Sequence, residues 1–151
     1  MRLRIAAALA LIVSSSVFAQ TIPDLSTAVP APGEWSYSTT ADGSEARFGL
    51  ATGSPRLVLH CTRATRRVSV ATPANPGTTL TNIWTSSQTR NVSSTFNPAT
   101  GRLSFELQAY DGLLDAIAMS RGRIGMSVGA QSPLVVPPWP EIARVVEDCR
   151  A

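Results

Sequence analysis

The stretch Arg56-Leu57-Val58-Leu59-His60-Cys61 is the part of the sequence from which the fold follows most directly. Leu57, Leu59 and Cys61 recur at every second position, which predicts a strand over residues 56–61 with these three side chains on one face. Cys61 therefore points toward the core. His60, the next residue back along the chain, lies on the opposite, outer face.

Cys149 is the only other cysteine, and it lies on the apolar stripe of a predicted C-terminal helix. Trp139-Pro140-Glu141 opens this helix, because proline suits the first helical turn. Both thiols point inward, so we expect a disulfide between Cys61 and Cys149 that ties the helix to the sheet and contributes on the order of 4 kcal/mol. The stripe consists of Ile142, Val145, Val146 and Cys149, while Arg144 and Asp148 form a predicted i,i+4 pair on the solvent side.

Outward from these two anchors, short runs rich in β-branched and aromatic residues are separated by Gly, Pro, Asn and Ser. The turns 97–101 and Asp42-Gly43 are predicted to use glycine in a left-handed conformation. These features predict an antiparallel β-sandwich or open barrel of about eight to ten strands. The predicted strands are 34–40, 45–50, 56–61, 66–71, 80–86, 90–96, 102–109, 124–128 and 133–136.

One short helix interrupts the strand pattern after Tyr110. The apolar period changes there from two to 3.6 residues, because Leu113, Leu114, Ile117 and Ala118 share one stripe. Asp111 stands where an N-cap acceptor belongs, and Gly122 ends the segment. The chain is therefore mainly β with one inserted helix and one terminal helix.

The N-terminus has the pattern of an export signal. Arg2 and Arg4 precede an apolar run, Ile5–Val13, and cleavage is expected near Ala19. The run is too short to span a bilayer, so we predict a signal peptide over residues 1–19 and a periplasmic or secreted location. Residues 20–33, rich in Pro, Ala and Thr, are predicted to form a linker, and residues 34–151 a single β-rich domain.

The charge balance argues against nucleic acid as a partner. All 13 basic residues are arginines and 10 residues are acidic, giving a net charge of +3. Two of these arginines belong to the predicted signal, so the exported chain is nearly neutral. No run of arginines is long enough to follow a phosphate backbone.

The segment Ser120-Arg121-Gly122-Arg123 is the strongest candidate for a binding site. Two guanidiniums flanking a glycine could hold a carboxylate, a phosphate or a sugar acid. In the alternative interpretation, Arg121 and Arg123 form structural ion pairs. The carboxylates available for such pairs are Asp111, Asp115, Glu147 and Asp148.

The sequence lacks the residues of a recognisable catalytic site. His60 is the only histidine, and the one Gly-x-Ser-x-Gly run, residues 125–129, falls in the predicted strand 124–128 and not at a strand-to-helix elbow. Asp111 and Asp115 could resemble an acid pair, but helix capping explains them better. A metal site would need more ligands than His60 and the two cysteines provide. We therefore predict no catalytic residue, no metal and no cofactor.

Several motifs together resemble a group of secreted and periplasmic proteins of alphaproteobacteria. They are a tryptophan near the mature start, the strand cysteine, Leu114-Asp115-Ala116, Ser120-Arg121-Gly122-Arg123, Trp139-Pro140-Glu141 and Glu147-Asp148-Cys149-Arg150. More loosely, the chain is similar to periplasmic proteins of the invasion-associated locus B type, from which it differs in having only two cysteines. The resemblance implies location and architecture, without catalytic residues.

Three functions fit these observations. The first is a non-enzymatic protein that binds another envelope or secreted protein. The second is an inhibitor that inserts a rigid loop, 62–66 or 72–79, into a secreted hydrolase. The third is a small enzyme whose polar groups converge around His60, or around Asp111 and Arg121.

Overall fold

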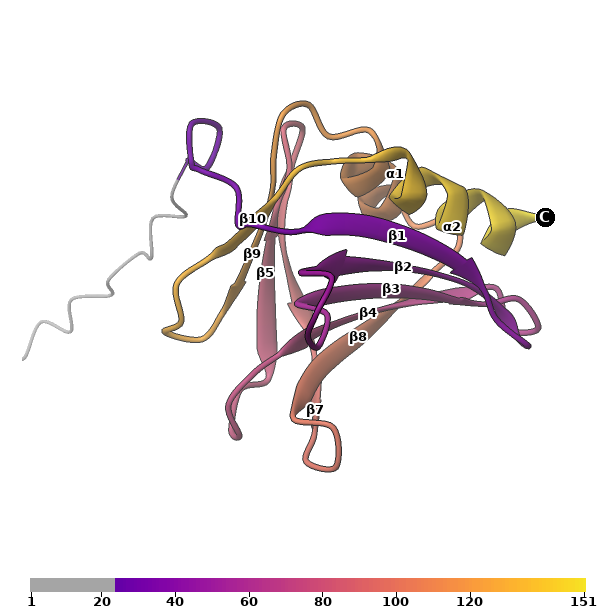
Figure 1. Cartoon of the computed structure of the whole chain (residues 1–151), viewed down its shortest axis with the longest axis horizontal. Coiled ribbons are helices and arrows are strands. Elements are labelled where there is room, and N and C mark those ends of the chain that lie inside the picture. Colours follow the sequence, from indigo (N-terminus) through magenta and orange to yellow (C-terminus); the bar gives the residue numbers. More distant parts are fainter. Residues whose placement is uncertain (1–23) are drawn as a thin grey trace, which may run out of the picture.

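Ten strands and two helices make up the part of the chain that the structure, a computed structural model, describes: residues 24–151 (Figure 1). The predicted signal peptide, 1–19, lies outside these residues. The elements are β1 (Glu34–Thr39), β2 (Gly43–Gly49), β3 (Leu57–Thr62), β4 (Arg67–Pro73), β5 (Leu80–Trp84), β6 (Thr89–Ser93), β7 (Thr95–Asn97), β8 (Arg102–Gln108), α1 (Gly112–Ala118), β9 (Ile124–Val128), β10 (Leu134–Val136) and α2 (Pro140–Arg150).

The strands form two antiparallel sheets, one in the order β1-β2-β3-β4-β8-β7 and one in the order β10-β9-β5-β6. In Figure 1, β5, β9 and β10 run across the direction of β1 to β4. The sheets meet at one side where only Ser94 separates β6 from β7. At the other side the Ala31 amide donates to the Val135 carbonyl, at 2.7 Å. The predicted mainly β, antiparallel architecture is confirmed.

The two faces of the six-stranded sheet differ as the alternating pattern predicts. On β3, Leu57, Leu59 and Cys61 are buried, whereas Val58 and His60 are only partly covered. Each large apolar side chain buried in this way contributes about 1.5–3 kcal/mol. The buried faces of both sheets and both helices belong to one apolar core.

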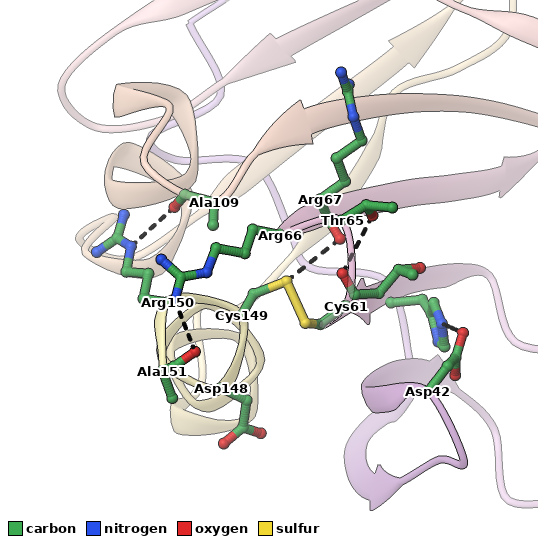
Figure 2. The surroundings of a disulfide bond; sticks show 12 residues. Asp42, Cys61, Thr65, Arg66, Arg67, Ala109, Asp148, Cys149, Arg150 and Ala151 are labelled. Atoms are coloured by element: carbon green, nitrogen blue, oxygen red, sulfur yellow. Dashed lines mark hydrogen bonds and ion pairs between the residues drawn. A yellow bond between two sulfur atoms is a disulfide. The ribbon is translucent and has the colours of Figure 1, made fainter.

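The predicted disulfide is confirmed, and it holds α2 against the inner face of β1 to β4 (Figures 1 and 2). The Cα atoms of Cys61 and Cys149 are 5.5 Å apart, a normal spacing for a disulfide, and both residues are fully buried. Arg150 extends the anchor, because its Nε donates to the Ala109 carbonyl at 2.8 Å (Figure 2). Neither helix is long and apolar enough to cross a membrane.

A polar anchor on β1 complements the disulfide. The hydroxyl of Tyr37 donates to Asp148 Oδ2 at 2.7 Å, and the Arg144 guanidinium lies 4.3 Å from the centre of the Tyr37 ring. Burial raises the pKa of Asp148, but the Tyr37 hydrogen bond and nearby guanidiniums outweigh it, so this pKa lies below its usual range. The predicted solvent-side pairing of Arg144 with Asp148 is wrong, because Tyr37 binds both side chains.

Residues 24–33 differ from the predicted linker, because they lie against the four-stranded sheet. Leu25 is only 8% exposed, and its side chain occupies the space above Gly125. A Cβ at Gly125 would lie 2.1 Å from Leu25 Cδ1, so any other residue there would have to displace the end of the Leu25 side chain. The composition of residues 20–33 does not predict this contact, because Gly125, against which Leu25 packs, lies about a hundred residues further along the chain.

The predicted strand 90–96 is divided at Ser94. The Ser94 amide donates to the Thr79 carbonyl at 2.8 Å, and its hydroxyl lies 2.8 Å from Thr81 Oγ1. These bonds hold the bend where the chain passes from one sheet to the other. The turn after β7 is as predicted, with Gly101 at φ +64° and its amide bonded to the Asn97 carbonyl.

Gly43 is required for a different reason from the one predicted. Its φ is not positive; instead, a Cβ at this position would lie 2.1 Å from the Cys61 carbonyl oxygen on β3. The close approach of two backbones, rather than a left-handed turn, demands glycine here.

Gly43→Ala should therefore lower the free energy of unfolding by at least about 2 kcal/mol, because the backbone of β2 or β3 must move. Gly112→Ala is the matched control, since a Cβ there meets no atom within 4 Å. Thermal unfolding of the two purified variants checks this expectation. Equal melting temperatures for both variants would contradict it.

Removing the disulfide should lower the free energy of unfolding by about 2–5 kcal/mol, because the bond closes a loop of 88 residues. Urea unfolding of the oxidised protein, with and without dithiothreitol, measures the loss. The Cys61→Ser, Cys149→Ser double variant should match the reduced protein and show no response to dithiothreitol. An unchanged midpoint after reduction would contradict the anchoring role.

Candidate functional site

A shallow cavity of about 560 Å³ lies between the loop joining β5 to β6 and the helix α1. The loop contributes Ser86, Ser87 and Gln88, and α1 contributes Gly112, Asp115 and Ala116. Met119 and Arg121, which follow α1, complete the rim. The cavity, called the α1 groove below, is of the size that small ligands and partner side chains occupy.

Two loops that form the groove are bonded to each other. The amide of Ser86 donates to Ser120 Oγ at 3.0 Å, and the amide of Arg121 donates to Ser86 Oγ at 2.8 Å. The Ser120 hydroxyl also donates to the Arg123 carbonyl at 2.6 Å. Ser120 is only 7% exposed, so its hydroxyl is a buried polar group with its bonds satisfied. This pair of loops fixes the backbone from which Arg121 projects.

The start of α1 is fixed by Asp111, which confirms its predicted role as N-cap. Asp111 Oδ1 accepts from the Leu113 amide at 2.8 Å, and both carboxylate oxygens accept from the Arg90 guanidinium, at 2.6 and 3.2 Å. These bonds to Arg90 lower the pKa of Asp111 against the opposing effect of burial. Gln88 Nε2 donates to the Gly112 carbonyl at 3.2 Å and joins the loop to the helix.

Asp115, one turn further along α1, has its own cation. Arg150 of α2 reaches it at 2.7 Å and places its guanidinium 5.3 Å from the centre of the Tyr110 ring. Asp111 and Asp115 therefore bond to different arginines on different elements, Arg90 and Arg150. This arrangement supports structural roles for both carboxylates rather than an acid pair.

The structure separates the two arginines that the sequence groups together. Arg123 Nε donates to the Ala28 carbonyl at 2.7 Å, so this side chain holds the N-terminal segment against the domain. Arg121 is exposed on the rim of the α1 groove. Neither arginine forms an ion pair with a carboxylate of the described residues. The predicted structural ion pairs are therefore wrong, because Arg90 and Arg150 take Asp111 and Asp115, and Tyr37 takes Asp148.

His60 lies on the outer face of β3, as predicted, and away from the α1 groove. Its Nε2 is 3.1 Å from Asp42 Oδ2, and its Nδ1 is 3.7 Å from Glu45 Oε2. The hydrogen bond from His60, helped by Thr40, lowers the pKa of Asp42. Over residues 24–151, no three His, Cys, Asp or Glu side chains are placed to hold a metal ion.

Arg63 and Arg66 lie in the tight turn between β3 and β4, and Arg67 begins β4. The Arg63 amide donates to the Asp42 carbonyl and the Ala109 amide donates to the Arg66 carbonyl, each at 2.9 Å. Arg66 has a left-handed backbone, with φ +50°. The turn is thus held by main-chain bonds to two other segments.

Sequence reasoning found Arg121 but missed the other side of its groove. Ser86 ends the predicted strand 80–86, and Ser87 and Gln88 fall between two predicted strands. In the structure β5 ends at Trp84, so all three residues lie in the loop. The only local signal was a run of three hydrogen-bonding side chains in a turn. Their contact with residues 120–121 depends on how the second sheet packs beside α1, and no local pattern encodes that.

Asp111→Asn should lower the free energy of unfolding by about 1 kcal/mol at pH 7, since asparagine keeps the cap but loses the charge that bonds to Arg90. The folded-state pKa of Asp111 lies below the ordinary 3.8. Its ionised form therefore stabilises the protein above that pH and loses this effect as the pH falls through the folded-state pKa.

Urea unfolding between pH 7 and pH 2 measures this difference, which should close toward the acid end. Arg90→Gln is the matched variant, because it removes the cation and leaves the carboxylate. In an Arg90→Gln background, Asp111→Asn should have a smaller effect. A difference from the unaltered protein that stays constant at all pH values would contradict the role assigned to Arg90.

Comparisons with known proteins yield no match for this chain: no family model, no curated protein and no solved structure matches it. The resemblance to secreted alphaproteobacterial proteins stays a prediction. The geometry of the α1 groove is therefore the basis for any functional assignment.

Proposed function

We propose that the protein is an exported, non-enzymatic binding protein that engages another envelope or secreted protein through the α1 groove. The disulfide supports the location, because paired thiols persist in oxidising compartments. The signal-peptide pattern at residues 1–19 supports it as well. Binding, rather than chemistry, is favoured because the carboxylates near the groove bond to structural arginines and His60 lies on another face.

The presentation of Arg121 and Met119 on one rigid rim is the observation that carries this proposal. Met119 is 76% exposed, and Arg121 is exposed beside it. Arginine and methionine are both enriched in protein interfaces. Their backbone is held by the bonds between Ser86, Ser120 and Arg121, so little conformational freedom is lost when a partner binds.

A second candidate function, inhibition of a hydrolase, is favoured by the construction of the turn at residues 63–66. This turn follows the disulfide-bonded Cys61 directly and has main-chain bonds to Asp42 and Ala109. A loop fixed in this way can insert into an active site without first becoming ordered. A partner bound by this function would contact Ala64 instead of Met119.

Photo-crosslinking separates the two candidates. A photoreactive phenylalanine analogue is placed at Met119, at Ala64 or at Val29 in the full-length protein expressed in its own host. Val29 is the control, since it is an apolar residue with 87% exposure that neither lines the α1 groove nor belongs to the turn at residues 63–66. We expect one discrete protein adduct from position 119 and none from position 29. An adduct from position 64 alone would replace the groove proposal with the inhibitor, and no adduct from any position would overturn both.

Two arginine substitutions give an independent check. Arg121→Gln should leave the melting temperature nearly unchanged, because its side chain has no hydrogen-bond or ion-pair partner among the described residues. Arg123→Gln should lower the melting temperature by several degrees, since it loses the bond to Ala28. Equal loss of stability in both variants would contradict the separation of roles.

A further inference from the structure

We propose that the α1 groove recognises a single carboxylate next to an apolar group, with Arg121 as the residue that binds the carboxylate. This inference rests on the proposed function and specifies what the partner must present. The occupant that we propose is a C-terminus of the partner protein that ends in an apolar residue, because it presents both groups next to each other.

The charged side chains around the groove indicate that its ligand is an anion. Asp111 bonds to Arg90 through both of its oxygens, and Asp115 bonds to Arg150 at 2.7 Å. The two acidic side chains nearest the groove are thus already neutralised by residues of other elements. Arg121 forms no ion pair with any carboxylate of residues 24–151, so the rim carries one uncompensated positive charge.

The sign and size of the ligand charge follow from the same residues. A guanidinium offers a planar fork of donors that matches a carboxylate with two parallel hydrogen bonds. A phosphate dianion would bring a second negative charge into a cavity that Asp115 also lines. That second charge would have no cation to balance it, because Arg150 is already paired. A monoanion is therefore preferred.

The apolar part of the ligand is indicated by Met119 and Ala116, which line the groove beside Arg121. Met119 is 76% exposed, and a long, flexible thioether side chain adapts to aliphatic groups of different shapes. The volume of about 560 Å³ accommodates a few non-hydrogen groups beyond the carboxylate itself. Ser87 and Gln88, on the opposite wall, can hydrogen-bond to a peptide backbone.

The fixed backbone makes the site specific as well as charged. The Arg121 amide is held by Ser86 Oγ at 2.8 Å, and Gly122 adopts φ +83°, which turns the chain sharply behind it. The guanidinium therefore projects from a defined point of the rim. Binding therefore restricts fewer rotatable bonds of Arg121 than it would for an arginine in a mobile loop.

Titration of the isotopically labelled, disulfide-bonded protein followed by nuclear magnetic resonance tests the proposal. The probes are N-acetyl-alanyl-leucine with a free carboxylate, the same dipeptide as its amide, isovalerate and inorganic phosphate. The acid dipeptide should shift the amide signals of Ser87, Gln88 and Met119 and bind at least about ten-fold more tightly than its amide, the factor that one charge-assisted hydrogen bond provides. Phosphate should bind more weakly than the acid dipeptide.

Variants at three positions identify the responsible side chain. Arg121→Gln should weaken binding of the acid dipeptide about ten-fold, and Arg121→Lys should recover only part of it, because lysine lacks the planar fork. Arg56→Gln is the control, since it removes an equal charge from an exposed position outside the groove and should leave binding unchanged. Met119→Ala should weaken binding of the acid dipeptide more than binding of inorganic phosphate, which has no apolar part.

The outcomes distinguish this inference from the proposed function. Equal binding of the acid and the amide, unchanged binding by Arg121→Gln, or tighter binding of phosphate would each overturn carboxylate recognition. A crosslinked adduct from position 119 that persists in Arg121→Gln would overturn it too, while leaving the proposed function standing. Isovalerate binding as tightly as the acid dipeptide would overturn the assignment of a protein C-terminus as the occupant and identify a free acid as the ligand.

Discussion

The covalent bond between Cys61 and Cys149 is the constraint on which the rest of the structure depends. It fixes α2 on the inner face of the six-stranded sheet, where the helix closes the apolar core over β1 to β4. Arg150, the next residue, then bonds to Ala109 and Asp115 and positions α1 against α2. The α1 groove is thus linked to the disulfide by a continuous series of contacts.

Most of the arginines around the two helices and the N-terminal segment are bonded to other groups of the protein, and Arg121 differs from them. Arg90, Arg123, Arg144 and Arg150 are used for a helix cap, the N-terminal segment, the Tyr37 ring and the junction of the two helices. Arg121 is held only through its backbone, so its charge remains free at the rim.

Rigidity and exposure occur together at the α1 groove, which is the combination expected of a binding site on a stable scaffold. Loops that carry function are commonly held by the elements beneath them. Here the loops at Ser86 and Ser120 hold each other, while the cap at Asp111 and the bond from Gln88 hold the helix between them. Loss of the disulfide would therefore be felt at the groove as well as in the core.

Periodicity and residue chemistry alone determined much of this protein. The alternation around Cys61 predicts the strand and its inward face, and the stripe ending at Cys149 predicts the helix. The two cysteines, in a chain predicted to be exported, predict their bond. Each of these predictions depends on neighbours within a few residues or on a unique pair. Only the tertiary structure decided that Leu25 lies over Gly125, that Gly43 is required by a neighbouring strand, that Tyr37 binds both Arg144 and Asp148, and that Ser86 meets Arg121. These contacts join residues far apart in the chain. Which arginine pairs with which carboxylate depends on the distances between their side chains. Those distances are set only when the sheets and helices have packed.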